Sequence, residues 1–214
     1  MAQRRLQTVL RDLSLSLRES RDLASDAHHW STPGGAVSRP HISVQRRDSL
    51  IELAFLKAFL AWEVFLEESF VLYLVGQGSP RGRAPLRFAF PPSLRAAKEW
   101  VIPEERSFAK WTDPRRVSDR AERFFRNGLP FSPVLRGSQN ALDEARTIRN
   151  AVAHVSSSAR ENFEKLVRTK LGTLPPRMTI GGFLGTTMPH GGGPTTFLEN
   201  YVSHIEFMAQ KIIP

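Results

Sequence analysis

The sequence predicts an all-α fold, an antiparallel helical bundle whose connecting loops are rich in Pro, Gly and Arg. Three observations lead to this prediction. Apolar residues recur at three- and four-residue steps through several long segments, no region is rich in strand signals, and the 214 residues are 41% apolar and 24% charged. A chain of this length can bury one sizeable core, so we expect a single helical domain over residues 1–214.

Two long helices are expected first along the chain. One spans about residues 3–30, where apolar residues share one face: Leu6, Val9, Leu13, Leu17 and Ala24. The other begins at Asp48 or Ser49, either of which can cap it, and it ends at Gly76 and Gly78. Charged residues interrupt its apolar sequence before any uncharged run approaches the ~20 residues of a membrane span. We therefore expect a central helix buried against several others, and no membrane contact.

The insert at about residues 77–137 changes character, because it is rich in Pro, Gly and Arg and shows no period. Short helices are expected within it at about residues 93–101 and 114–126. Asp113 can cap the second of these, and Pro114 suits its first helical position. We expect the insert to be an elaborated connection and not a second core.

A third long helix is expected from Ser138 to Val155. Its buried stripe has helical spacing: Leu142, Ala145, Ile148, Val152 and Val155. A fourth helix follows at about residues 159–171, where Ser158 and Glu161 match a capping box at the start.

The C-terminal part begins with a Gly- and Pro-rich excursion at about residues 172–194, where we expect at most a short extended pair. Thr196 and Glu199 then match another capping box. The last helix follows, with apolar residues along one side: Phe197, Tyr201, Ile205, Met208 and Ile212. This side is expected to be core or a dimer interface.

The formal charge of +9 favours a polyanionic partner, either nucleic acid or an anionic membrane surface. The alternative is a bias toward Arg without a function. Arginine grips phosphate with a planar fork, and candidates for RNA contacts are Arg115, Arg116, Arg120 and Arg123 of the insert, together with Arg146. A solvated basic loop is the other interpretation of the insert. The absence of Cys excludes disulfides and thiolate metal sites, and we expect a cytoplasmic protein without metal or cofactor.

The stretch TIRNAVAHV, residues 147–155, carries the candidate catalytic residues Arg149, Asn150 and His154. Each helical residue turns about 100°, so one flank of the expected helix carries Asp143, Thr147, Asn150 and His154. Arg149 points roughly 140° away from His154. One helix alone therefore does not bring Arg149 onto His154, whereas a second copy crossing the first at a two-fold axis can, and we expect a homodimer.

These residue types suit the cleavage of RNA without a metal. An imidazole titrates near neutrality, so His154 can take the 2′-hydroxyl proton or protonate the 5′-oxygen leaving group. The guanidinium of Arg149 suits the phosphoryl oxygens, and Asn150 can orient the imidazole or donate to phosphate. The expected products are a 2′,3′-cyclic phosphate and a 5′-hydroxyl.

The stretch RNAVAH, from Arg149 to His154, resembles the motif Arg, polar residue, three residues, His of the HEPN superfamily (higher eukaryotes and prokaryotes nucleotide-binding). The segment AFLKAFLAWEVFLEESFVLYL, residues 54–74, is similar to the leading core helix of a bacterial branch, the RiboL-PSP-HEPN and related nucleases. Arg149 and His154 match the catalytic pair of the family, and Asn150 matches its polar position. The insert and residues 172–194 match nothing that we can align.

The resemblance implies a HEPN-like bundle and a metal-independent endoribonuclease that dimerises through the motif helices. Many members of the family are toxins or effectors of phage defence, so an antitoxin or a defence-system partner is implied as well. One subset carries Tyr two positions after the His, and its antitoxin modifies that Tyr. Ser156 occupies this position here, which argues against regulation of that kind.

Other interpretations of the same residues stay open. Arg149 can pair with Asp143 or Glu144 on a solvated flank while His154 caps the helix. Glu63 and Glu67 can orient the motif, or they can form salt bridges with the insert. Two other functions are therefore considered. One is an inactive HEPN-like module that binds RNA or a nucleotide, and the other is a scaffold or interaction protein such as a toxin neutraliser.

Overall fold

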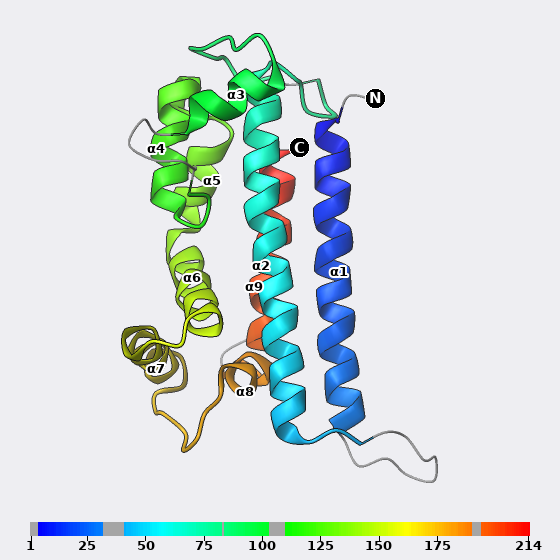
Figure 1. Ribbon diagram of the computed structural model, residues 1–214, viewed down its shortest axis with the longest axis vertical. Coiled ribbons are helices and arrows are strands. Elements are labelled where there is room, and N and C mark those ends of the chain that lie inside the picture. Colours follow the sequence, from blue (N-terminus) through cyan, green and yellow to red (C-terminus); the bar gives the residue numbers. More distant parts are fainter. Residues whose placement is uncertain (1–3, 32–40, 83, 103–109, 190–193) are drawn as a thin grey trace. The chain divides into compact units, whose positions relative to one another are not determined.

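The computed structural model describes residues 4–31, 41–82, 84–102, 110–189 and 194–214 (Figure 1). Within these ranges the chain is helical, and its only extended pairings are two isolated β-bridges. This confirms the prediction of an all-α fold. None of the helices described in these ranges combines the length and the apolar character needed to cross a membrane.

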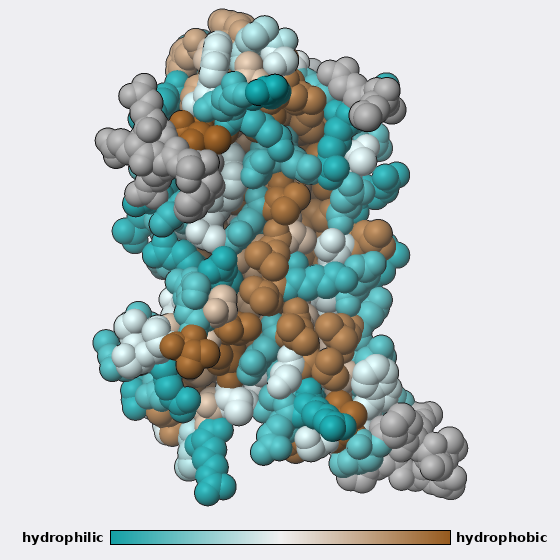
Figure 2. Space-filling model, in the orientation of Figure 1, coloured by the Kyte–Doolittle hydropathy of each residue, from teal (hydrophilic) through white to brown (hydrophobic). Residues whose placement is uncertain are grey.

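The chain divides into two compact units, each of which collects separate stretches of sequence. Unit 1 comprises Met1–Leu15, Ala61–Asp143 and Ile205–Pro214, and unit 2 comprises Ser16–Leu60 and Glu144–His204. Four helices contribute residues to both units: α1 (Leu6–Ser31), α2 (Val44–Leu74), α6 (Gln139–Ala153) and α9 (Phe197–Ile212). The surface over α2 carries apolar side chains among polar ones (Figure 2), and Leu53, Leu60 and Val64 are exposed there.

The start of α2 differs from the expectation. The helix begins at Val44, where the Ser43 hydroxyl accepts a hydrogen bond from the Arg46 amide at 3.3 Å. The predicted cap at Asp48 or Ser49 is therefore wrong. Asp48 lies inside the helix, is buried, and its carboxylate pairs with Arg47 at 2.7 Å and accepts a hydrogen bond from the Thr179 hydroxyl. The carboxylate thus serves a long-range contact instead of capping the helix.

The predicted end of α2 is confirmed by the left-handed backbone at Gly76, whose φ is 95°. Arg87 Nη1 donates to the carbonyl oxygen of Leu74 at 2.8 Å. A Cβ at Gly76 would lie 2.8 Å from the same guanidinium, which would have to shift, while the backbone conformation itself favours glycine. The guanidinium cation satisfies a carbonyl at the negative end of the helix.

The insert folds into a substantial part of unit 1. The predicted helices are present as α3 (Leu94–Val101) and α4 (Pro114–Phe124), and Asp113 caps α4 as expected. The short helix η1 (Arg126–Gly128) and α5 (Phe131–Gly137) were not expected, and α5 lies beside α4 (Figure 1).

Aromatic side chains hold the insert together. Four rings surround the buried ring of Phe70 on α2, with centroids 5.0–6.1 Å away: Trp111, Phe124, Phe125 and Phe131. Such pairs add attraction beyond the area that they bury. The insert therefore supplies hydrophobic core to unit 1, which differs from the elaborated connection that its composition predicts.

In unit 2 the helix of the motif is α6 (Gln139–Ala153), close to the predicted range. Leu142, Ala145 and Ile148 are buried as predicted, but Val152 is half-buried and Val155 is fully exposed. The stripe ends early because the chain leaves the helix after His154: the Ser156 amide donates to the His154 carbonyl at 3.0 Å.

Two further helices complete unit 2. The first, α7 (Ser157–Leu171), is capped by Ser156, which accepts from the Ala159 amide at 3.2 Å, so the predicted cap at Ser158 is displaced by two residues. The second, α8 (Ile180–Gly185), was not expected in a Gly-rich segment. It forms because Phe183 is buried and stacks on Phe197 at 4.3 Å.

The segments that flank α9 agree with the sequence more closely. An isolated antiparallel bridge joins Thr187 and Thr196. The Thr196 hydroxyl accepts from the Glu199 amide at 3.2 Å, which confirms this cap. The predicted apolar side of α9 is buried throughout: Phe197, Tyr201, Ile205, Met208 and Ile212.

Candidate active site

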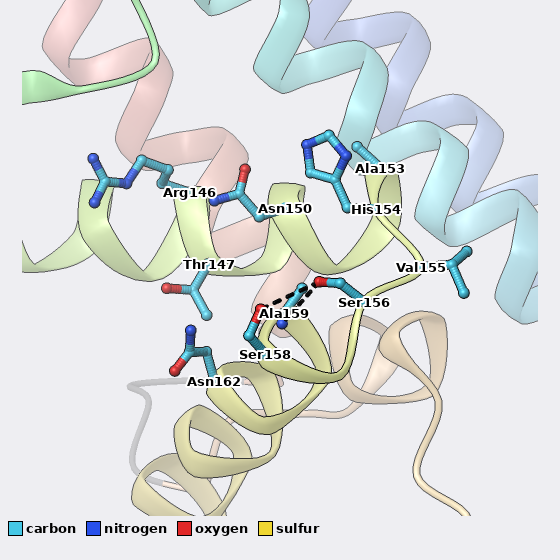
Figure 3. Close-up of a pocket in the computed structure, with 10 residues that line it drawn as sticks. All are labelled: Arg146, Thr147, Asn150, Ala153, His154, Val155, Ser156, Ser158, Ala159 and Asn162. Atoms are coloured by element: carbon cyan, nitrogen blue, oxygen red, sulfur yellow. Dashed lines mark hydrogen bonds between the residues drawn. The ribbon is translucent and has the colours of Figure 1, made fainter.

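A polar hollow of about 710 Å³ opens beside the motif, wholly within unit 2 (Figure 3). Arg146, Asn150 and His154 follow one another along one side of α6 and line this first hollow. The hydroxyl and amide side chains across it come from the start of α7: Ser156, Ser158 and Asn162. The first hollow therefore gathers a guanidinium, an amide, an imidazole and several hydroxyl groups.

The tight connection between α6 and α7 positions His154. Its amide donates to the carbonyl oxygen of Asn150 at 2.9 Å, so His154 completes the last turn of α6. Ser156 then caps α7 only two residues later, and its hydroxyl lies 3.4 Å from that of Ser158. The side chain of His154 stays exposed because the chain turns before any further element can cover it. Helical periodicity thus accounts for the shared flank of Thr147, Asn150 and His154.

The electrostatics of the first hollow favour an anion. The first turn of α7 contributes Ser158 and Ala159 to its wall. The Ala159 amide donates to the Ser156 hydroxyl, and the N-terminus of a helix carries a partial positive charge. Arg146 adds a full positive charge. A phosphate group suits this combination of backbone amides, guanidinium and hydroxyl donors.

Arg149 lies differently from the rest of the motif. It is half-buried and is not among the residues that line the first hollow. Its Nη1 lies 3.4 Å from Oδ1 of Asn150, at the long end of a hydrogen bond. The structure therefore brings Arg146, Asn150 and His154 together, and Arg149 reaches this group through Asn150.

A second hollow of about 660 Å³ adjoins the first, also within unit 2, and sequence reasoning missed it. Its walls are mainly apolar and include Val155, Phe163, Met178 and Ile180. The carboxyl group of Glu52 also lines it, and Oε1 of this group accepts from the Gly181 amide at 2.9 Å. Burial raises the pKa of Glu52, the hydrogen bond from Gly181 opposes this, and Asp48 adds to it. The only signal in the sequence was a charge within an otherwise apolar helix.

The insert arginines, which belong to unit 1, do not all remain on the surface. Arg115 and Arg116 are exposed and pair with Asp143 at 3.3 Å and Asp113 at 3.6 Å. Arg123 is exposed as well. The prediction that Arg120 contacts RNA is not compatible with its burial, because only 8% of it is exposed.

Arg120 instead packs inside unit 1. Its guanidinium carbon lies 4.5 Å from the centre of the Trp111 ring. Burial lowers the pKa of Arg120 to about 10, with further lowering by Arg123 and Arg116 and an opposing contribution from Glu67. The side chain therefore acts as a cation over an aromatic face within the core.

The two carboxylates suggested as orienting groups belong to unit 1. Glu67 accepts from Lys98 of α3 at 3.1 Å, in agreement with the alternative of a salt bridge to the insert. Glu63 is half-buried on α2, and its role as an orienting group stays a prediction. Of the other carboxylates near the motif in sequence, Glu144 pairs with Lys170 at 2.7 Å and accepts from the Tyr201 hydroxyl at 3.0 Å.

The described residues contain no cluster of three or more His, Asp or Glu side chains arranged to hold a metal ion. The first hollow instead offers proton transfer and anion binding by side chains of the chain itself. No family model, curated protein or solved structure matches this chain, so the function is argued from the chemistry of the site.

Proposed function

We propose that the protein is a metal-independent endoribonuclease that cleaves RNA by attack of a 2′-hydroxyl on the adjacent phosphorus. The observation that carries this proposal is the first hollow, where Arg146, Asn150 and the exposed His154 follow one another along α6 and face the start of α7. This combination supplies both an anion site and a proton-transfer group.

The scissile phosphate is placed in the first hollow. Arg146 and the first turn of α7 bind its non-bridging oxygens, and Asn150 donates to the same group or holds the imidazole. These donors become more valuable as negative charge builds up on the phosphorane. Arg149, in contact with Asn150, holds this amide in place and adds positive charge.

The reaction needs one base and one acid. The 2′-oxygen forms a bond to phosphorus while its proton passes to the base, and the bond from phosphorus to the 5′-oxygen breaks as that oxygen takes a proton from the acid. His154 supplies one of these groups. A second copy of the chain, related by a two-fold axis, supplies the other His154, which is why we propose a homodimer of motif helices.

The biological setting follows from the resemblance to the HEPN superfamily. A nuclease of this kind acts as a toxin or as an effector of phage defence, and it requires restraint by an antitoxin or by a partner of a defence system. The basic side chains exposed on the insert, Arg115, Arg116 and Arg123, suit the RNA backbone outside the cleavage site.

A second candidate function has a specific observation in its favour. Arg149 lies outside the first hollow, so a single chain presents one imidazole without the motif guanidinium facing it. This arrangement suits a module that binds RNA or a nucleotide without cutting it. The two functions differ in one measurement, the cleavage of RNA.

Purified protein is incubated with mixed-sequence RNA in EDTA, and the product ends are analysed. We expect cleavage with 2′,3′-cyclic phosphate ends, and His154→Ala lowers the rate at least ~10²-fold, the usual contribution of an acid–base group. The control is His41→Ala, which changes an exposed histidine outside both hollows and leaves the rate unchanged. If RNA stays intact, or if His154→Ala cuts as well as the parent protein, the nuclease proposal fails and the binding module is favoured.

A further inference from the structure

The two hollows share a wall. His154, Val155 and Ser156 line both of them, so the second hollow begins where the first one ends. The first is polar and basic, and the second is bordered by Phe163, Met178 and other apolar side chains. A nucleotide has the same division, since a charged phosphate is joined through a sugar to a flat base with apolar faces. A phosphate in the first hollow therefore directs the base of the same nucleotide toward the second.

Besides its apolar side chains, the second hollow is lined by hydroxyl groups, His154 and charged groups of both signs. Glu52 is half-buried on α2, and the hydrogen bond from the Gly181 amide fixes its Oε1. Gly181 itself packs so closely on α2 that a Cβ there would overlap the carbonyl oxygen of Asp48. The position of the Glu52 carboxylate is thus set by backbone contacts, and an ionised carboxylate can only accept hydrogen bonds.

Two guanidinium groups also line the second hollow. Arg160 lines the second hollow from α7 and pairs with Glu164 at 3.1 Å. Arg177 is exposed in the segment before α8, and its φ of 58° is unusual for a residue other than glycine. Both are donors only. Glu164 also lines the second hollow but is engaged by Arg160, so the carboxylate there that is held by a backbone amide is that of Glu52, and the donors are Arg160 and Arg177.

We propose that the second hollow binds the guanine base of the nucleotide whose 3′-phosphate occupies the first hollow. Guanine has two adjacent donors, N1–H and the N2 amino group, which together match one carboxylate. Its O6 and N7 acceptors match a guanidinium. Adenine and cytosine offer one amino group beside an acceptor, and uracil offers one N–H between two carbonyl groups, so none of them matches Glu52 with two hydrogen bonds.

The inference rests on the proposed function for its consequence, which is cleavage of RNA after guanosine. The attacking 2′-hydroxyl belongs to the nucleotide that carries the scissile 3′-phosphate. The base in the second hollow is therefore that of the nucleotide on the 5′ side of the cut. The recognition of guanosine with an adjoining phosphate can be measured without any cleavage.

Binding is measured by calorimetry with the four nucleoside 3′-monophosphates. We expect the parent protein to prefer guanosine 3′-monophosphate at least ~10-fold over each of the others, the usual discrimination of a bidentate contact. Glu52→Gln keeps an acceptor for the Gly181 amide but replaces one carboxylate oxygen by a donor, so the four affinities become similar. The matched control is Glu161→Gln, an exposed position on α7 outside the second hollow, which keeps the preference.

Several results would overturn the inference. These are four equal affinities in the parent protein, no binding of any of the four, or a guanosine preference that survives in Glu52→Gln. Arg177→Gln provides a second test at an exposed position, where the change does not threaten folding. It should weaken the binding of guanosine 3′-monophosphate ~10-fold. Tighter binding of GTP than of guanosine 3′-monophosphate would assign the second hollow to free nucleotides and overturn the RNA assignment.

An RNA oligonucleotide with a single guanosine separates this inference from the proposed function. Cleavage after the guanosine, and loss of this preference in Glu52→Gln, support both. Selective binding of guanosine 3′-monophosphate without any cleavage means that the nuclease proposal fails while guanine recognition stands. Cleavage without a guanosine preference means the reverse.

Discussion

The insert in unit 1 and the turn between α6 and α7 in unit 2 use arginine in opposite ways. In the insert, Arg120 is buried over the ring of Trp111 and belongs to the core. In unit 2, Arg146 on α6 lines the polar first hollow, which extends to the exposed His154 at this turn. Both arginines add equally to the charge of +9, so the charge of a chain indicates a polyanion partner without locating the surface that binds it.

The difference arises from the neighbours of each residue. The sequence around Arg120 contains aromatic side chains that gather around Phe70, and a guanidinium can stack on such rings while its stem fills space. Arg146 lies within α6 and is half-buried, and the side chains that share the first hollow with it are mostly small and polar instead of aromatic.

The largest expected effect concerns the aromatic core of unit 1. Phe70→Ala removes the ring that four others surround, and we expect a loss of ~3–5 kcal/mol in the free energy of unfolding, as for other large-to-small core changes. Urea denaturation measures this. The control is Phe90→Ala in the insert, which is exposed and should change stability by less than ~0.5 kcal/mol. Equal effects of the two changes would show that the insert is a connection without a core of its own.

An intermediate effect separates the two arginines directly. Arg120→Ala should lower the free energy of unfolding by ~1–3 kcal/mol, because it leaves a cavity against Trp111, and it should leave RNA affinity unchanged. Arg146→Ala should do the reverse. The free energy of unfolding stays unchanged, and the slope of log binding constant against log salt concentration becomes shallower by about one, as expected for one lost phosphate contact. Filter binding at several salt concentrations, together with denaturation, tests both. A weaker RNA affinity in Arg120→Ala at full stability would contradict the comparison.

The smallest expected effect is a pH dependence within unit 2. Burial lowers the pKa of His28, with Arg47 adding to this effect and Asp48 opposing it. The unfolded chain therefore takes up this proton at a higher pH than the folded protein. The contribution of His28 to the free energy of unfolding is fully present above the ordinary histidine pKa of about 6.5. It decreases as the pH falls below that value and levels off below the pKa of the folded protein.

Denaturation at a series of pH values from neutral to mildly acidic measures this dependence. His28→Gln should flatten it, whereas His41→Gln, at an exposed position, should leave it unchanged. A curve that is the same for the parent protein and for His28→Gln would exclude His28 as the source.

The site could be predicted from the sequence as far as one helix determines it. The shared flank of Thr147, Asn150 and His154 follows from helical periodicity, and the same argument placed Arg149 on another side. The exposure of Val155 could not be predicted, because the chain turns at Ser156, which caps the next helix. The apolar pattern continues past the point where the helix ends.

The place of Glu52 in the second hollow could not be predicted from the pattern of its own helix. In sequence it is one of several charges within an apolar helix. It becomes part of a hollow only because Gly181, from a segment far along the chain, packs against α2 and donates to its carboxylate. The burial of Arg120 has a similar origin, since its guanidinium lies over Trp111, which itself packs on Phe70 of α2.

By itself the sequence determined the helical class, the approximate ranges of the long helices, the caps at Asp113 and Thr196, and the shared face of the motif. Each of these depends on interactions between residues within about one helical turn, which propensity and periodicity describe. Only the tertiary structure decided which arginine is buried, where the chain turns after His154, and that a carboxylate lies in a hollow beside the motif. These features depend on contacts between distant segments, and packing against such partners overrides the local preference.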